Sequence, residues 1–314
     1  MSDLIILTEA GGAVGYGHLT RCQAIADCMD TKIYVHADGC YPETNKVKSF
    51  AWRTKPAQLI KDFPSKKSIL IDSYLASVGI YELFSNHFHH VSVIDDYDRL
   101  VYPVELVINP GVKLPEYKNQ TAQIIGGNEY IILRKEIIQH SRKTDYQNFR
   151  NLLVTFGGCD SSHVFEWLIP LLAEHQYLSV TIVTGNAENS NELSKKFNVS
   201  SVKWLGQIDA LDMAALMYQS DICISAGGQT LHELAFIGVP TISIETGLDQ
   251  INNIDGYIDS GFLLKKLSLQ NIDLKNNIAD LLMQYRNKEL RIRTAEIGKN
   301  LVDGLGSMRI AKLL

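Results

Sequence analysis

A glycine-containing segment near the start of the chain carries a histidine in a setting suited to catalysis. Residues 15–22 read Gly-Tyr-Gly-His-Leu-Thr-Arg-Cys and follow an apolar run, residues 4–8, that is typical of a buried parallel strand. We expect a helix over residues 20–29. Glycines between a strand and a helix let the backbone approach a ligand closely, and the helix N-terminus favours an anion. His18 could therefore act as a base beside an anionic ligand, which indicates an enzyme.

This segment also admits other interpretations, and the chain contains a second histidine group. A capping or packing role for His18 fits its position alone equally well. Thr20 stands where the third glycine of a dinucleotide fingerprint would fall, and the chain has no P-loop motif. The histidine-rich residues 86–90 lack a His-x-x-x-His spacing, so they are interpreted as a solvated turn rather than a metal site.

Two further glycine turns follow strand-like runs in the second half of the chain. Residues 156–160 read Phe-Gly-Gly-Cys-Asp, and residues 225–230 read Ser-Ala-Gly-Gly-Gln-Thr. Both could cradle a diphosphate with backbone N–H groups. Glu233 could accept hydrogen bonds from a ribose diol, or it could only complement a helix dipole. Residues 245–253 are rich in amides and acids, which could bind sugar hydroxyls or serve as caps.

The elements that position these residues alternate between strands and helices in two series, separated by a polar stretch at residues 134–150. This pattern predicts two doubly wound α/β domains with ligands at the carboxyl ends of the strands, and residues 134–150 as their connection. The expected strands are residues 4–8, 32–36, 68–71, 91–94, 106–108, 151–156, 179–184, 202–205, 221–225 and 241–244. The expected helices include residues 20–29, 77–87, 162–174, 210–218, 229–237 and 252–260.

Composition is typical of a folded protein with room for two domains. The chain has 314 residues, 46% of them hydrophobic and 21% charged, with a formal net charge of −5, which gives no support for nucleic-acid binding. The first residues carry an acid and no base, and no apolar run approaches the roughly 20 residues of a membrane span. The five scattered cysteines fit reduced thiols. We therefore expect a cytoplasmic protein without a membrane segment.

The motifs together resemble a known family. They are the segment from Gly15 to Arg21, the two glycine turns, Glu233, Gln250-x-x-Asn253, and a closing Asp-Gly-x-Gly-x-x-Arg at residues 303–309. The combination resembles the UDP-sugar hydrolases of pseudaminic acid biosynthesis. That family resembles in turn the glycosyltransferase of peptidoglycan lipid II synthesis and a broader group of spore-coat-type polysaccharide proteins.

The resemblance implies an α/β, GT-B architecture: two Rossmann-like domains that face a cleft. The N-terminal domain would span residues 1–140 and carry the histidine loop, and the C-terminal domain, residues 150–297, would bind UDP. Residues 298–314 would form a C-terminal helix that could pack across both domains. The expected partners are the UDP-sugar and other enzymes of the sugar pathway, with no cofactor and no metal.

The implied reaction is release of UDP from UDP-2,4-diacetamido-2,4,6-trideoxy-β-L-altropyranose, or a related UDP-sugar, by inverting attack of water at the anomeric carbon. His18 would be the general base. The alternatives are a UDP-sugar-dependent inverting GT-B glycosyltransferase of surface polysaccharide synthesis and a non-catalytic nucleotide-sugar sensor. By the resemblance, the substrate-binding residues are Gly15, Gly17, Arg21, Tyr74, Asp95, Gln250 and Asn253. The UDP-binding residues are Gly157, Gly158, Gly227, Gly228, Gln229, Thr230 and Glu233.

Overall fold

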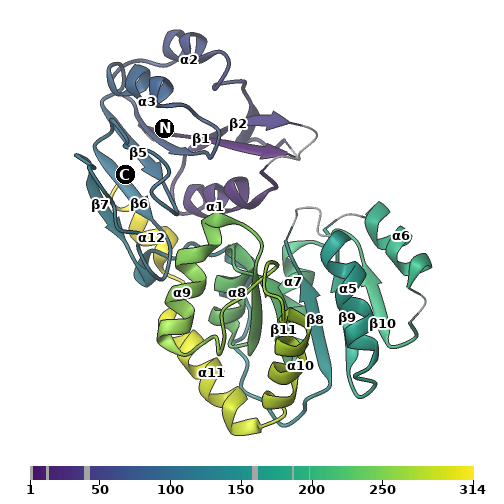
Figure 1. The fold of residues 1–314 in the computed structure, drawn as a ribbon. Helices are drawn as coiled ribbons and strands as arrows, with labels where there is room; N and C mark the ends of the chain where they lie inside the picture. The colour runs from purple at the N-terminus through teal and green to yellow at the C-terminus, as the bar shows by residue number, and fades with distance from the viewer. Residues whose placement is uncertain (1–2, 12–13, 39–42, 158–161, 186, 198) are drawn as a thin grey trace. The chain divides into compact units, whose positions relative to one another are not determined.

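Two parallel sheets organise the computed structural model, which describes residues 3–11, 14–38, 43–157, 162–185, 187–197 and 199–314 (Figure 1). The first unit comprises Met1–Arg134 and Gly304–Leu314, and the second unit comprises Lys135–Asp303. No helix among the described residues is both long and apolar enough to cross a membrane.

The first unit is built on a seven-stranded sheet of order β3-β2-β1-β4-β5-β6-β7, with every pair parallel. Its strands are β1 (Leu4–Gly11), β2 (Lys32–Asp38), β3 (Val47–Ser49), β4 (Ser68–Asp72), β5 (His90–Ile94), β6 (Leu106–Asn109) and β7 (Gln123–Gly126). Its helices are α1 (Gly17–Ala26), α2 (Pro56–Asp62), α3 (Val78–Ser85), the 3₁₀ turn η1 (Asn128–Tyr130) and α12 (Gly306–Ala311).

Alternation along β1 divides the core of the first unit between the two faces of the sheet. Leu4 and Ile6 pack in one apolar cluster with residues of α1 and with Ile310 of α12. Ile5 and Leu7 pack in another with residues of α2 and α3. Successive side chains of a strand point to opposite faces, so a continuous apolar run is what a sheet covered on both sides requires.

The second unit holds a six-stranded parallel sheet of order β10-β9-β8-β11-β12-β13. Its strands are β8 (Asn151–Thr155), β9 (Ser179–Val183), β10 (Val202–Leu205), β11 (Ile222–Ala226), β12 (Thr241–Glu245) and β13 (Leu267–Ser268). Its helices are α4 (Lys135–Gln139), α5 (Ser162–Ala173), α6 (Ala187–Lys196), α7 (Ala210–Gln219), α8 (Gln229–Ile237), the 3₁₀ turn η2 (Leu248–Gln250), α9 (Ile251–Ser260), α10 (Leu274–Gln284) and α11 (Lys288–Leu301).

The two predicted α/β domains and all ten predicted strands are confirmed, and three details differ from expectation. Helix α1 begins at Gly17, not at residue 20, so His18 lies in its first turn. Residues 135–150 belong to the second unit, because α4 packs against α7 and α8. The tail from residue 298 is not one helix: α11 ends at Leu301, and α12 packs within the first unit, against α1 and η1 (Figure 1).

Candidate active site

The order of strands in the first unit reverses between β1 and β4, and the predicted base lies at this point. The chain runs outward from β1 through β2 and β3, then returns to add β4 on the other side of β1. Ligands of open α/β sheets bind at the carboxyl ends of strands beside such a reversal. His18 follows β1, and Asp72 is the last residue of β4.

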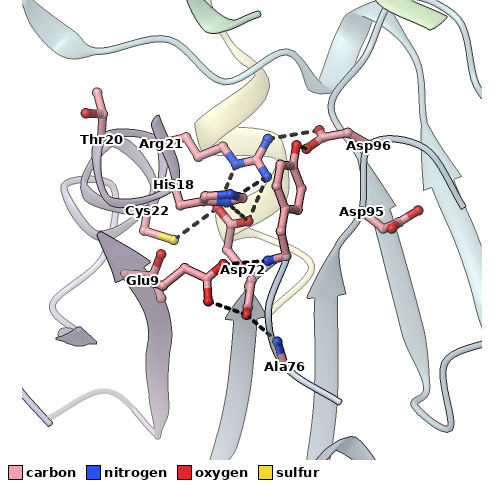
Figure 2. Close-up of polar contacts among 12 residues, drawn as sticks. Glu9, His18, Thr20, Arg21, Cys22, Asp72, Ala76, Asp95 and Asp96 are labelled. Carbon is pink, nitrogen blue, oxygen red and sulfur yellow. Dashed lines mark hydrogen bonds and ion pairs between the residues drawn. The ribbon is translucent and has the colours of Figure 1, made fainter. Parts of the chain in front are cut away.

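His18 and Asp72 form a buried pair (Figure 2). The Nδ1 atom of His18 lies 2.6 Å from Oδ1 of Asp72. We assign the proton to Nδ1, because a carboxylate accepts and does not donate. In neutral His18 the lone pair is then on Nε2, the form in which an imidazole takes a proton from a reacting group.

Arg21 completes the charge balance around this pair. Its Nε atom lies 2.6 Å from Asp72 Oδ2 and its Nη2 atom 2.6 Å from Asp72 Oδ1, and Nη1 lies 2.9 Å from Asp96 Oδ1. Burial raises the pKa of Asp72, but Arg21 and His18 outweigh it and hold that pKa well below its usual range. Burial likewise lowers the pKa of Arg21, and Asp72 and Asp96 more than offset this. Asp72 is therefore anionic and Arg21 cationic throughout the physiological range.

Tyr74 lies against the histidine. Its ring meets that of His18 edge-on, with 4.2 Å between centroids. The Tyr74 hydroxyl donates a hydrogen bond to Oδ2 of Asp96, the carboxylate that also binds Arg21. His18, Arg21 and Tyr74, which the sequence singled out separately, thus share one hydrogen-bonded cluster.

Asp95 does not belong to that cluster. Its carboxylate accepts hydrogen bonds from the backbone N–H groups of Asp98 and Arg99, at 2.7 and 3.1 Å, and from the hydroxyls of Tyr102 and Tyr117, at 2.8 and 3.1 Å. Figure 2 shows it apart from the side chains around His18. Burial raises the pKa of Asp95, although most of these donors act in the other direction. The Asp95 carboxylate thus binds the following loop, whereas the carboxylate of the next residue, Asp96, binds Arg21 and Tyr74.

Asp72 and Asp96 are the members of the cluster that sequence reasoning left without a role. Each carboxylate lies at or just beyond the carboxyl end of a strand, β4 and β5, and the two strands are neighbours in the sheet. Their position in the sequence could have indicated that they belong to the site, because side chains that follow adjacent parallel strands meet at the carboxyl ends of those strands.

The glycines of the first segment shape the backbone before α1. Gly15 has a φ of +67°, and it exchanges two backbone hydrogen bonds with Gly11. Among the described residues, no atom outside the neighbouring backbone lies within 4 Å of the position that a Cβ on Gly17 would take. The described part of the protein therefore leaves room for a small side chain at position 17.

In the second unit the order of strands reverses between β8 and β11, and the predicted phosphate turns follow these two strands. Gly157 has a φ of +80°, whereas Gly158 lies outside the described residues. Gly228 precedes α8, whose first residues are Gln229 and Thr230. The turn after β11 thus leads into a helix N-terminus, the setting that favours an anion.

The side chain of Gln250 contacts this turn. Its Oε1 atom accepts hydrogen bonds at 3.0 Å from the backbone N–H of Gly227 and from that of Thr246. Glu233 is buried on α8, one turn beyond its start rather than in the first turn, so the interpretation as a dipole-complementing acid loses its basis. Asn253 is buried on α9.

Replacing Gly227 with alanine is expected to destabilise the protein by about 1–3 kcal/mol, the usual range for overpacking. A Cβ at Gly227 would lie 2.5 Å from Cδ1 of buried Ile254, whereas a Cβ at Gly228 would have no atom of the described residues, apart from its own neighbours, within 4 Å. Gly228→Ala is the matched control, with a loss below about 1 kcal/mol from the poorer helix cap. Urea denaturation measures both, and equal midpoints would contradict the packing argument.

The comparisons with known proteins concern both units. Residues 152–290, within the second unit, match the model of the glycosyltransferase family 28 C-terminal domain. The spore coat polysaccharide biosynthesis protein SpsG of Bacillus subtilis is 26% identical over 210 residues, which cover 63% of this chain and 60% of that protein. In Helicobacter pylori, the protein described as pseudaminic acid cytidylyltransferase and UDP-2,4-diacetamido-2,4,6-trideoxy-beta-L-altropyranose hydrolase is 21% identical over 274 residues, which cover 85% of this chain and 48% of that protein. The matched regions therefore span 60% and 48% of the lengths of these two relatives, less than two thirds of either.

The fold also matches solved structures. The crystal structure of MurG from Acinetobacter baumannii aligns with a TM-score of 0.65 at 14% identity, covering 99% of this chain and 98% of that one. Together with the two parallel sheets and the family match to the second unit, this likeness shows a GT-B, glycosyltransferase-like fold.

Proposed function

Because the chain has a glycosyltransferase-like GT-B fold, we propose that it is a UDP-sugar hydrolase, with UDP-2,4-diacetamido-2,4,6-trideoxy-β-L-altropyranose as the substrate to test first. The observation that carries the proposal is the buried pair of His18 and Asp72 at the strand-order reversal of the first unit. The name of the Helicobacter pylori relative supports the choice of substrate.

In the proposed reaction His18 is the general base. Its Nε2 accepts a proton from water as the water oxygen forms a bond to the anomeric carbon. The bond from that carbon to the phosphate oxygen breaks, and its electron pair leaves with UDP. Asp72 stabilises the imidazolium that forms, because its carboxylate is already bonded to Nδ1. Attack opposite the leaving group inverts the configuration.

We assign the remaining residues to binding. Gly157, Gly158, Gly227, Gly228, Gln229 and Thr230 would bind the diphosphate and Glu233 the ribose. Glycine-turn amides and a helix N-terminus can stabilise the charge that develops on UDP without reorganisation. Gly15, Gly17, Arg21, Tyr74, Gln250 and Asn253 would bind the sugar side, with Asp96 in place of Asp95.

The test is incubation of the purified protein with this UDP-sugar in ¹⁸O-labelled water, without an acceptor. Proton NMR at early times is expected to show UDP and free sugar in equal amounts, with the anomeric configuration inverted. Mass spectrometry is expected to find the label on the sugar and not on UDP, because the carbon–oxygen bond breaks. Label on UDP would contradict the mechanism. UDP binding without turnover would contradict hydrolysis of this substrate and direct attention to transfer onto an acceptor.

A further inference from the structure

Another buried carboxylate, Glu9, lies below the cluster just described (Figure 2). Glu9 is on β1, and only 1% of its surface is exposed. Nothing in the proposed reaction uses it. A carboxylate is rarely buried unless it is fully hydrogen-bonded, so its partners define what it does.

The groups that donate hydrogen bonds to Glu9 belong to one turn, residues 73–76, which follows β4. Oε1 of Glu9 accepts hydrogen bonds from the backbone N–H groups of Tyr74 and Leu75, at 2.7 and 3.2 Å. Oε2 accepts one from the Ser73 hydroxyl at 2.6 Å, and Arg53 Nε lies 3.3 Å from the same oxygen. The Ser73 hydroxyl oxygen in turn accepts from Leu75 and Ala76. One carboxylate therefore ties the turn to β1.

Tyr74 is consequently held at both ends. Glu9 holds its backbone, and Asp96 holds its hydroxyl. Between these two attachments the ring lies edge-on against His18. The position of the Tyr74 ring thus depends on a carboxylate that does not itself reach the histidine.

We propose that Glu9 is a positioning residue for the reaction at His18: it fixes the turn of residues 73–76 and thereby holds the Tyr74 ring against the histidine. The role in turnover rests on the proposed hydrolysis. The structural part stands by itself, because the ring contact exists in the protein without substrate. Misplacement of a catalytic group by about 1 Å can cost on the order of 10²-fold in rate, so such a support has a measurable effect.

The first test measures the contact between the rings of Tyr74 and His18 and needs no turnover. The Tyr74 ring shifts the NMR signals of the His18 ring protons through its ring current, and Tyr74→Leu provides the value without that ring. In Glu9→Ala the His18 signals are expected to move toward the Tyr74→Leu value. In Ser73→Ala, which removes one of the three bonds to Glu9, they are expected to move the same way by less. His18 signals that stay at the wild-type position in both variants would overturn the proposal.

The second test separates kcat from KM. Glu9→Ala is expected to lower kcat on the order of 10-fold or more with KM changed less than threefold. Glu9→Gln is expected to lie between Glu9→Ala and the wild type, because the glutamine carbonyl still accepts from Tyr74 and Leu75. Glu105→Ala is a control far from the turn: the exposed Glu105 carboxylate accepts from the Val91 backbone N–H, at 2.8 Å, at the amino end of β5. An equal fall in kcat in Glu105→Ala would show a general loss of stability and overturn the proposal.

The two tests also distinguish this proposal from the proposed function. If the wild type does not hydrolyse the UDP-sugar, the proposed function fails, and the His18 signals still decide whether Glu9 holds the ring. If Glu9→Ala does not fold, Ser73→Ala and Glu9→Gln carry both measurements.

Discussion

His18→Ala is expected to lower kcat for UDP release by about 10²–10⁴-fold, the usual contribution of a positioned general base. The variant keeps the residues assigned to UDP, which lie in the second unit, so the dissociation constant for UDP should change little. The imidazole is buried and hydrogen-bonded to Asp72, and in the proposed reaction it is the group that takes the proton from water. UDP release in a coupled assay and UDP binding by calorimetry measure the two quantities.

His89→Ala is the matched control, because His89 is an exposed histidine of the same unit. It should retain the wild-type rate. A His18→Ala protein that still hydrolyses the substrate at a rate within tenfold of the wild type would remove His18 from the mechanism. A loss of UDP binding in the same variant would mean that the substitution disturbs more than the base.

Asp72→Asn is expected to destabilise the protein by about 3–5 kcal/mol, the typical result of removing one partner of a buried ion pair. Asp72 is fully buried and accepts two hydrogen bonds from Arg21. The uncharged amide leaves that guanidinium buried with Asp96 as its remaining carboxylate partner. Asparagine can also donate to Nδ1 of His18, which would place the imidazole proton on Nε2 and abolish its action as a base. Both unfolding free energy and kcat should therefore fall.

The difference in unfolding free energy between the wild type and Asp72→Asn is expected to depend on pH. The folded-state pKa of Asp72 is depressed, so the unfolded state binds the proton more readily. The stabilisation is then complete above the unfolded aspartate pKa of about 3.9 and is lost as the pH falls from there toward the folded-state value. Urea midpoints of the wild type and Asp72→Asn should differ by a constant amount from pH 5 to 8 and converge in acid.

Asp3→Asn is the control. It removes a carboxylate that is 82% exposed and lies 3.4 Å from Lys67, and it should lower the free energy of unfolding by less than about 1 kcal/mol at every pH. A difference between the wild type and Asp72→Asn that widens in acid would contradict the depressed pKa of Asp72.

The sequence predicted most of the fold because its strands are buried on both faces and appear as continuous apolar runs. The three strands it missed lie at or near the sheet edges and carry little of that signal. β3 and β13 span Val47–Ser49 and Leu267–Ser268, too short for any periodicity, and β7 has no buried residue. The start of α1 was placed three residues late because Gly17 and His18 are not strong helix formers, and their place in the helix depends on tertiary contacts.

Only part of the candidate site could be predicted, because motifs identify single residues and not the partners that the fold brings to them. His18, Arg21 and Tyr74 were singled out by motif, and the structure brings them together. The different partners of the adjacent Asp95 and Asp96 could not be predicted, because the direction of each side chain depends on the path of the loop after β5. No prediction for Glu9 could be made from the sequence, because its hydrogen-bond donors Ser73 and Tyr74 are more than sixty positions away in the chain.

The return of the chain to the first unit has a consequence for its synthesis. Gly306 is packed so tightly that a Cβ there would lie 2.1 Å from the carbonyl oxygen of Ile131, and Ile310 shares an apolar cluster with Leu19 and Cys22 of the helix that carries His18. The ribosome makes residues 304–314 only after all of the second unit. That face of α1 in the nascent first unit therefore stays uncovered until residues 304–314 have been made.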